Sequence, residues 1–226
     1  MCFSPEASFG AAAVISTIGV ISYRKAKQPE SKFLALVPFV FGLQQFFEGW
    51  LWLTLENEAL AHWEHHATLG FLIFAWLVWP VYMPYALWKL EKSEPRKKTL
   101  LALLLTGCLV AIGCIYTLIW LNPVANIVGH SIKYTFDVTS PYAGVFMFVY
   151  LTTTLAPAVI SSVPKMWIVG TLNLLSYAFI RITYHEHVVS IWCFFGSIIS
   201  ALILWVIVEY NRESDVKETE REVLIT

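Results

Sequence analysis

The stretch FGLQQFFEG, Phe41–Gly49, decides the fold, because it places two amides and a carboxylate inside an otherwise apolar run. That run, Phe33–Leu55, is long enough to cross a bilayer, for which about 20 apolar residues are needed. Gln44, Gln45 and Glu48 therefore lie where hydrocarbon is expected. An ionisable residue there is costly and marks a functional or packing-critical position. We expect the rest of the chain to form a membrane scaffold around these residues.

The composition is that of a membrane protein. Of the 226 residues, 58% are hydrophobic and 14% are charged, whereas a soluble domain carries about a quarter charged residues. Ten tryptophans suit helices with interfacial anchors. The net charge of −1 and the lack of an RNA-binding signature predict no nucleic-acid partner. The lipid bilayer is the expected partner, and the oligomeric state is left open.

Seven apolar runs follow one another along the chain, each of roughly the length that a membrane span needs. They are Ala7–Tyr23, Phe33–Leu55, Thr68–Leu90, Leu100–Leu121, Ala143–Ser161, Met166–Ile182 and Val188–Tyr210. The sequence therefore predicts an all-α fold, an integral membrane bundle of seven transmembrane helices over residues 1–210. Residues 211–226 are predicted to be a charged cytoplasmic tail that frays.

The basic residues predict the orientation of the bundle. With seven spans, 13 of the 15 lysines and arginines fall on one side, and only Lys133 and Arg181 fall on the other. Cytoplasmic loops carry the excess of Lys and Arg. The N-terminus is therefore predicted outside and the C-terminus in the cytoplasm, in a plasma or inner membrane.

All six histidines fall on the outer side in this topology. His62 and His66 are four residues apart, and His185 and His187 form a second pair. Imidazole and carboxylate together hold zinc or another divalent metal. These four histidines are therefore a candidate metal site, although no complete HExxH signature is present. The alternative interpretation is that they are solvated loop residues without a metal.

The polar residues of the second run have a candidate partner in the sixth. Glu48 lies about 22 Å along the second helix from its start, at 1.5 Å per residue, in the outer half of the bilayer. In the sixth run Asn173, Tyr177 and Arg181 recur every four residues and form one polar stripe. This pattern predicts an ion pair between Glu48 and Arg181 at the floor of an outward-facing cavity.

The remaining residues of both polar stripes would line that cavity. Gln44 and Gln45 share a helix face with the carboxylate, and the tyrosine and asparagine of the sixth run lie below the arginine. The alternative is that the ion pair only fixes helix register, because a buried pair is weak evidence for more than packing specificity.

Four motifs add a resemblance to a known family. They are MCFSPEASF (Met1–Phe9), QQFFEG (Gln44–Gly49), WPVYMP (Trp79–Pro84) and SIWCFFGSIIS (Ser190–Ser200). The chain resembles an uncharacterised family of small polytopic membrane proteins that begin Met-Cys-Phe-Ser and carry Trp-Cys-Phe-Phe in the last helix. The resemblance implies a shared fold and no known reaction. It singles out Cys2, Ser4, Gln45, Glu48, Trp79, Pro80, Trp192 and Cys193.

Two classes of function remain from the sequence. The first is a membrane protein that binds, senses or transports a small ligand or ion in the outward-facing cavity, with Trp79 and Trp192 added to its lining by the resemblance. The second is a membrane-embedded, metal-dependent hydrolase in which the histidines hold the metal and Glu48 acts as acid or base.

Overall fold

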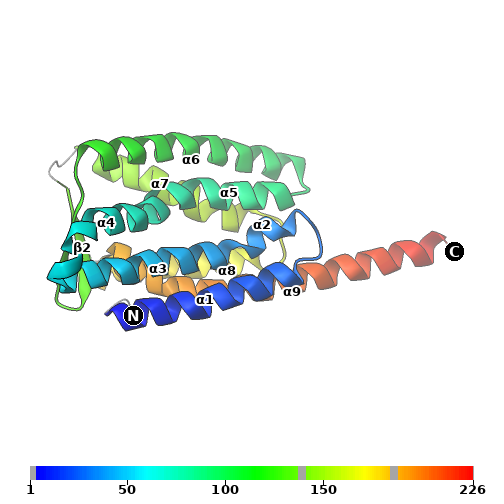
Figure 1. The fold of residues 1–226 in the computed structure, drawn as a ribbon. Helices are drawn as coiled ribbons and strands as arrows, with labels where there is room; N and C mark the ends of the chain where they lie inside the picture. The colour runs from blue at the N-terminus through cyan, green and yellow to red at the C-terminus, as the bar shows by residue number, and fades with distance from the viewer. Residues whose placement is uncertain (1–3, 137–140, 184–187, 226) are drawn as a thin grey trace.

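The computed structural model describes residues 4–136, 141–183 and 188–225. Across these residues the fold is mostly helical, and its helices form seven rods that lie side by side (Figure 1). The helices are α1 (Pro5–Lys25), α2 (Ser31–Ala35), α3 (Val37–Glu56), the 3₁₀ helix η1 (Glu58–Trp63), α4 (Glu64–Leu72), the π-helix η2 (Ile73–Val78), α5 (Trp79–Leu90), α6 (Glu94–Trp120), α7 (Ala143–Ile160), α8 (Met166–Thr183) and α9 (Val188–Ile225). A β-hairpin of β1 (Val124–Val128) and β2 (Ser131–Thr135) joins α6 to α7.

Successive rods run in opposite directions, so the connections gather at two ends (Figure 1). We call the end that carries the β-hairpin and η1 the hairpin end. The opposite end holds the connections 26–30, 91–93 and 161–165 and the C-terminal part of α9. We call it the basic end, because 13 of the 15 lysines and arginines lie on it or beside it.

Six of the predicted spans are confirmed as helical rods. Within the part of the chain that the structure describes, six rods are long and apolar enough to cross a membrane. They are Pro5–Lys25, Ser31–Glu56, Glu58–Leu90, Glu94–Trp120, Ala143–Ile160 and Met166–Thr183. The seventh predicted run, Val188–Tyr210, lies within α9.

The prediction for the C-terminal tail needs correction. The tail does not fray within the described residues, because α9 continues to Ile225. Asn211 Nδ2 donates to the Lys25 carbonyl at 2.8 Å, and Lys27 Nζ lies 2.7 Å from an Asp215 oxygen. These contacts join α9 to the end of α1 and to the connection that follows it, and they hold the first turns of the tail.

The segment between α6 and α7, which lies between two of the predicted spans, contains the β-hairpin. Val128 pairs with Ser131, so the strands are joined by a two-residue turn. Gly129 begins that turn with a φ of +64°, the left-handed region that tight hairpins use and that glycine adopts without steric cost.

The third rod contains a π-helical segment, η2, just before Pro80. In a π-helix the carbonyl of residue 75 faces the nitrogen of residue 80, which in a proline carries no hydrogen. The hydroxyl of Tyr150 on α7 donates to the Ala75 carbonyl instead. The proline therefore creates an acceptor that ties α7 to the third rod.

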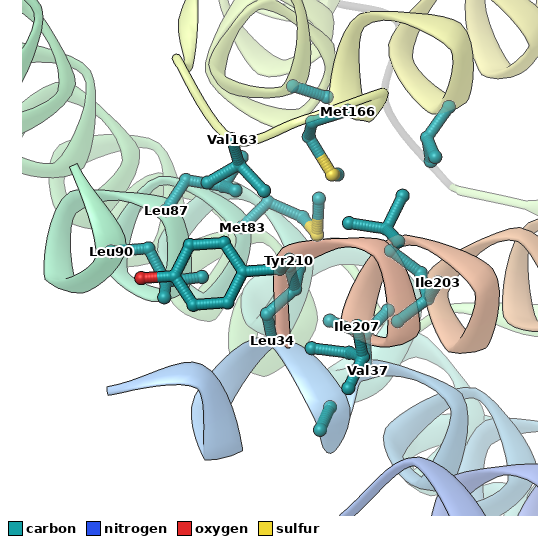
Figure 2. Close-up of a cluster of buried hydrophobic side chains, with 14 of the residues drawn as sticks. Leu34, Val37, Met83, Leu87, Leu90, Val163, Met166, Ile203, Ile207 and Tyr210 are labelled. Carbon is teal, nitrogen blue, oxygen red and sulfur yellow. The ribbon is translucent and has the colours of Figure 1, made fainter. Parts of the chain in front are cut away.

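The largest apolar core lies at the basic end. Figure 2 shows Leu34, Val37, Met83, Leu87 and Ile203 packed among side chains from α2, α3, α5, α9 and the α7–α8 turn. Leu34, Val37, Leu87 and Ile203 have no exposed surface. Close packing of this kind stabilises helix association where no water is present to drive it.

Candidate functional site

The three polar residues of α3 are buried. The exposed fraction is 1% for Gln44 and 0% for Gln45 and Glu48. Gln45 Nε2 donates to Glu48 Oε2 at 2.9 Å. A buried carboxyl group needs such donors, because burial without hydrogen bonds costs several kcal/mol. Glu48 therefore takes one of its hydrogen bonds from a side chain of its own helix.

Gln44 has a partner on a different rod. Trp79 Nε1 donates to Gln44 Oε1 at 2.7 Å. The ring of Phe41 stacks on Trp79, with ring centroids 4.0 Å apart and planes 29° apart. These contacts attach α3 to the start of α5 through Gln44, whereas the hydrogen bond between Gln45 and Glu48 lies within α3.

The polar stripe of α8 contacts α9. Trp192 Nε1 lies 2.9 Å from Asn173 Oδ1 and 3.2 Å from Ser176 Oγ, and both oxygens accept from it. The Tyr177 ring lies 5.1 Å from the Trp192 ring, centroid to centroid. Arg181 follows one turn later and is exposed.

A cavity of about 990 Å³ lies inside the bundle. Its wall includes both the Gln44–Trp79 contact and the contact of Trp192 with α8. Its wall comes from α3, η2, α5, α6, α7, α8 and α9, together with Leu121, Phe136 and Tyr142. Six of the eight predicted ligand-binding residues line it, and they are Gln44, Trp79, Asn173, Tyr177, Arg181 and Trp192. Gln45 and Glu48 are not part of the wall.

Most of the cavity wall is apolar or aromatic. The sequence analysis missed the contribution of α6 and α7, which includes Cys114, Phe146, Met147, Tyr150 and Leu155. These residues look like ordinary membrane-helix residues in the sequence, so no polar signal marks them. Their shared position becomes visible only when the helices are assembled.

The cavity is open toward the hairpin end. At the basic end α7 and α8 touch closely, because a Cβ added to Gly170 would lie only 2.8 Å from Val159 Cγ2. Toward the hairpin end, Phe148 of α7 is 70% exposed, and Tyr142, just before α7 begins, is 75% exposed. Both residues line the cavity. Residues that are exposed and also line the cavity show that its wall is incomplete on this side.

The predicted ion pair between Glu48 and Arg181 is not formed among the described residues. Glu48 is fully buried beside Gln45, whereas Arg181 is exposed. The reason lies in the order of the rods, since α9 packs against both α3 and α8. The two polar stripes therefore meet through α9 and around the cavity rather than directly.

The first pair of candidate metal-binding histidines, His62 and His66, lies on helices instead of in a loop. His62 belongs to η1 and His66 to α4, and both are exposed. The ring of Trp63 lies 5.4 Å from each imidazole ring, centroid to centroid. His185 and His187 lie outside the described residues. In the described ranges no three His, Cys, Asp or Glu side chains converge as metal ligands would.

Glu91 forms a polar junction at the basic end that the sequence analysis did not identify. It is 2% exposed. Its Oε2 accepts from the Ser162 backbone nitrogen at 2.7 Å, and its Oε1 accepts from the Ser93 nitrogen at 2.9 Å and from the Ser162 hydroxyl. The carboxylate thus ties the α5–α6 connection to the α7–α8 turn.

The pKa of the Glu91 carboxyl lies below its ordinary value, through opposing effects. Burial raises the pKa, since it penalises the charged form. The hydrogen bonds from Ser162 and Ser93 lower it, and so does the nearby positive charge of Arg96. The lowering effects prevail, so the junction is built around an ionised carboxylate.

The chain belongs to a family of unknown function, DUF6629, whose sequence profile matches residues 1–219. Neither a curated protein nor a solved structure matches it. The site is therefore interpreted from its own geometry.

Proposed function

We propose that this chain is an integral membrane protein with seven spans that binds a small, largely apolar molecule in the cavity. The six rods that are long and apolar enough to cross a membrane support this, and α9 supplies the seventh span. The excess of Lys and Arg at the basic end supports an orientation with that end in the cytoplasm and the N-terminus outside. The cavity then opens toward the outer half of a plasma or inner membrane.

The cavity is the observation that carries the proposal. Ligand pockets commonly enclose about 300–1,000 Å³ and combine apolar walls with a few placed polar groups. The volume of about 990 Å³ lies at the upper end of that range. The incomplete wall beside α7 gives a molecule dissolved in the bilayer a way in. Sensing and transport both begin with this binding step.

The metal-dependent hydrolase is the weaker candidate. A catalytic zinc site uses three protein ligands and one open position. Within the described ranges, His62 and His66 have no third ligand beside them. By contrast, described residues of seven helices, α3, η2, α5, α6, α7, α8 and α9, line the cavity.

Photolabelling tests the proposal. The probe is the methyl ester of a long-chain fatty acid with a diazirine in its chain, added to protein in lipid nanodiscs. Cys114 is 1% exposed and Tyr150 is 8% exposed, yet both line the cavity. Leu109 on α6 is 69% exposed and serves as a background site that meets the probe in the lipid. We expect label on Cys114 and Tyr150 in addition to this background.

The variant Gly144→Trp fills the opening of the cavity. Gly144 lines the cavity, and a Cβ added there meets no atom within 4 Å. We expect the indole to abolish labelling of Cys114 and Tyr150 and to leave Leu109 labelled. Gly10→Trp is the matched control, since Gly10 is exposed and has equally open space. If the unsubstituted protein were labelled only at exposed positions such as Leu109, and not at Cys114 or Tyr150, the proposal would be contradicted.

A further inference from the structure

We infer that the molecule in the cavity is an amphiphile with an oxyanion head group, either carboxylate or phosphate, and a long apolar chain. This inference rests on the proposed binding function and adds the chemical class of the ligand. Three observations support it: the charge of Arg181, the length of the cavity along the helices, and the hydrogen bonds that the polar atoms of the cavity wall make with other residues of the protein.

The charge is Arg181. Among the described residues that line the cavity, it is the one charged side chain, and none is acidic. It forms no hydrogen bond or ion pair with any residue in the described ranges. A guanidinium presents a planar fork of donors that matches carboxylate and phosphate oxygens in a bidentate way. No described residue pairs with this guanidinium, so its donors can meet a ligand anion at the open end of the cavity.

The position of Arg181 also runs against the distribution of charge in the chain. It is one of only two basic residues away from the basic end. Selection for topology favours few cations on the outer side. A lone arginine in the last turn of α8, beside the open part of the cavity, therefore has a local role that topology does not explain.

The wall beyond Arg181 suits an extended apolar chain. Val169 lines the cavity near the other end of α8, about 18 Å from Arg181 at 1.5 Å per residue. Leu155 and Ala158 of α7 and Ile199 of α9 line the same deep part. The cavity is thus elongated along the helices, with its cation at one end and aliphatic side chains at the other.

The polar atoms of the wall are largely engaged with one another. The Trp79 indole donates to Gln44, the Trp192 indole donates to Asn173, and the Tyr150 hydroxyl donates to Ala75. A ligand with polar groups spread along its length would find these donors occupied. A ligand whose polarity is confined to one end, at Arg181, matches the wall.

The test compares three diazirine probes with the same alkyl chain: the fatty acid, its methyl ester and the corresponding alkyl phosphate. Labelling of Cys114 is measured in nanodiscs at a pH where both acids are ionised. We expect the better of the two anionic probes to label Cys114 about tenfold more strongly than the ester, the factor that charge-assisted hydrogen bonds provide. A preference for carboxylate indicates a fatty-acid-like ligand, and a preference for phosphate indicates a lipid head group.

Variants of Arg181 then assign that preference to the guanidinium. Arg181→Gln should reduce anionic labelling to the level of the ester and leave ester labelling unchanged. Arg181→Lys should retain part of the preference, because the charge remains and the planar fork is lost. Lys98→Gln is the matched control, since it removes an exposed cation at the basic end.

The outcomes separate this inference from the function on which it rests. Equal labelling by ester and anions in the unsubstituted protein, or a preference that survives Arg181→Gln, overturns the inference and leaves the binding function standing. Absence of cavity labelling by all three probes overturns both. Competition by unlabelled fatty acid and unlabelled ester on the unsubstituted protein gives the same comparison without any variant, so a folding defect in Arg181→Gln does not decide the result.

Discussion

The basic end of the bundle is filled by apolar side chains, whereas a cavity of about 990 Å³ begins at the edge of that core, at Val37, Met83 and Val169, and extends into the hairpin-end half of the same helices. Ile203 and Leu34 are completely buried at the basic end (Figure 2), and Phe148 is 70% exposed on the hairpin-end half of α7. Both halves consist of apolar helices. The difference shows that in this fold packing, rather than hydrophobicity, separates the filled core from the cavity.

The contact between α7 and α8 is one place where the two regions differ. Gly170 lets the two helices touch near the α7–α8 turn, where a larger residue would meet Val159. Small residues permit such close approach in membranes. Toward the hairpin end α7 carries Phe146, Met147 and Phe148, which are exposed and line the cavity. The two helices are thus closely packed at the turn, and the other end of α7 contributes exposed side chains to the cavity wall.

Shortening one side chain in each half gives the largest expected contrast. Ile203→Ala should lower the free energy of unfolding by about 3 kcal/mol, because the cavity it leaves in a filled core is lined by side chains that lose contacts. Met147→Ala should cost less than about 1 kcal/mol, since Met147 is already 42% exposed. Unfolding by SDS, followed by circular dichroism, measures both. Similar costs at the two positions would remove the distinction between the halves.

Glu91→Gln tests whether the polar junction helps to hold the basic end together. We expect a loss of about 2 kcal/mol at pH 7, because hydrogen bonds to a charged acceptor are replaced by weaker ones. Glu56→Gln, at an exposed carboxylate of the hairpin end, is the control and should have little effect.

The pH dependence of the Glu91 contribution has a definite sign. The folded-state pKa is lower than the ordinary value of 4.5, so the ionised carboxylate stabilises the fold above that value. The contribution is lost as the pH falls through the lowered folded-state pKa. The stability gap between the unsubstituted protein and Glu91→Gln should therefore narrow as the pH is taken below 4.5. A gap that widens on acidification would mean that Glu91 is buried in its neutral form.

Trp79→Phe gives the smallest expected effect and tests the polar part of the cavity wall. The substitution keeps an aromatic ring against Phe41 and removes the donor to Gln44. We expect a loss of about 1 kcal/mol, the usual scale of a hydrogen bond between membrane helices. Trp205→Phe, on an exposed face of α9, is the control in the same SDS titration. Equal effects of the two substitutions would show that the Gln44 contact contributes no stability.

The sequence predicted the rods well because their signal is local. Runs of apolar residues and the Lys and Arg that follow them are sufficient to find six of the helices that the structure describes. The turn at Gly129 also has a local signal, because Val124–Val128 and Ser131–Thr135 flank a two-residue turn. A search for paired strands between the fourth and fifth apolar runs would have found the hairpin.

The arrangement of side chains between rods could not be predicted in the same way. Glu48 and Arg181 occupy comparable positions along their helices, and the sequence alone suggests that they meet. The structure inserts α9 between the two networks, because the order of neighbours depends on packing contacts spread over the whole bundle. Tyr150 and Cys114 line the cavity because of the same packing contacts between helices, which the sequence alone does not reveal. The polar residues of the sequence therefore predicted part of the cavity wall. Its apolar residues, which are the majority, could not be distinguished from other apolar residues of the helices.

Ligand-dependent stability tests most directly the claim that the open half is a binding site. The measurement is thermal unfolding of the protein in nanodiscs with hexadecanoate, compared between the unsubstituted chain and Gly144→Trp. At a ligand concentration of about 100 times Kd, binding to the folded state alone stabilises it by about 2.7 kcal/mol. We predict a rise of Tm with ligand in the unsubstituted protein and none in Gly144→Trp, while Gly10→Trp behaves as the unsubstituted protein does. An equal rise in Gly144→Trp, or no rise in any of the three, would contradict the account.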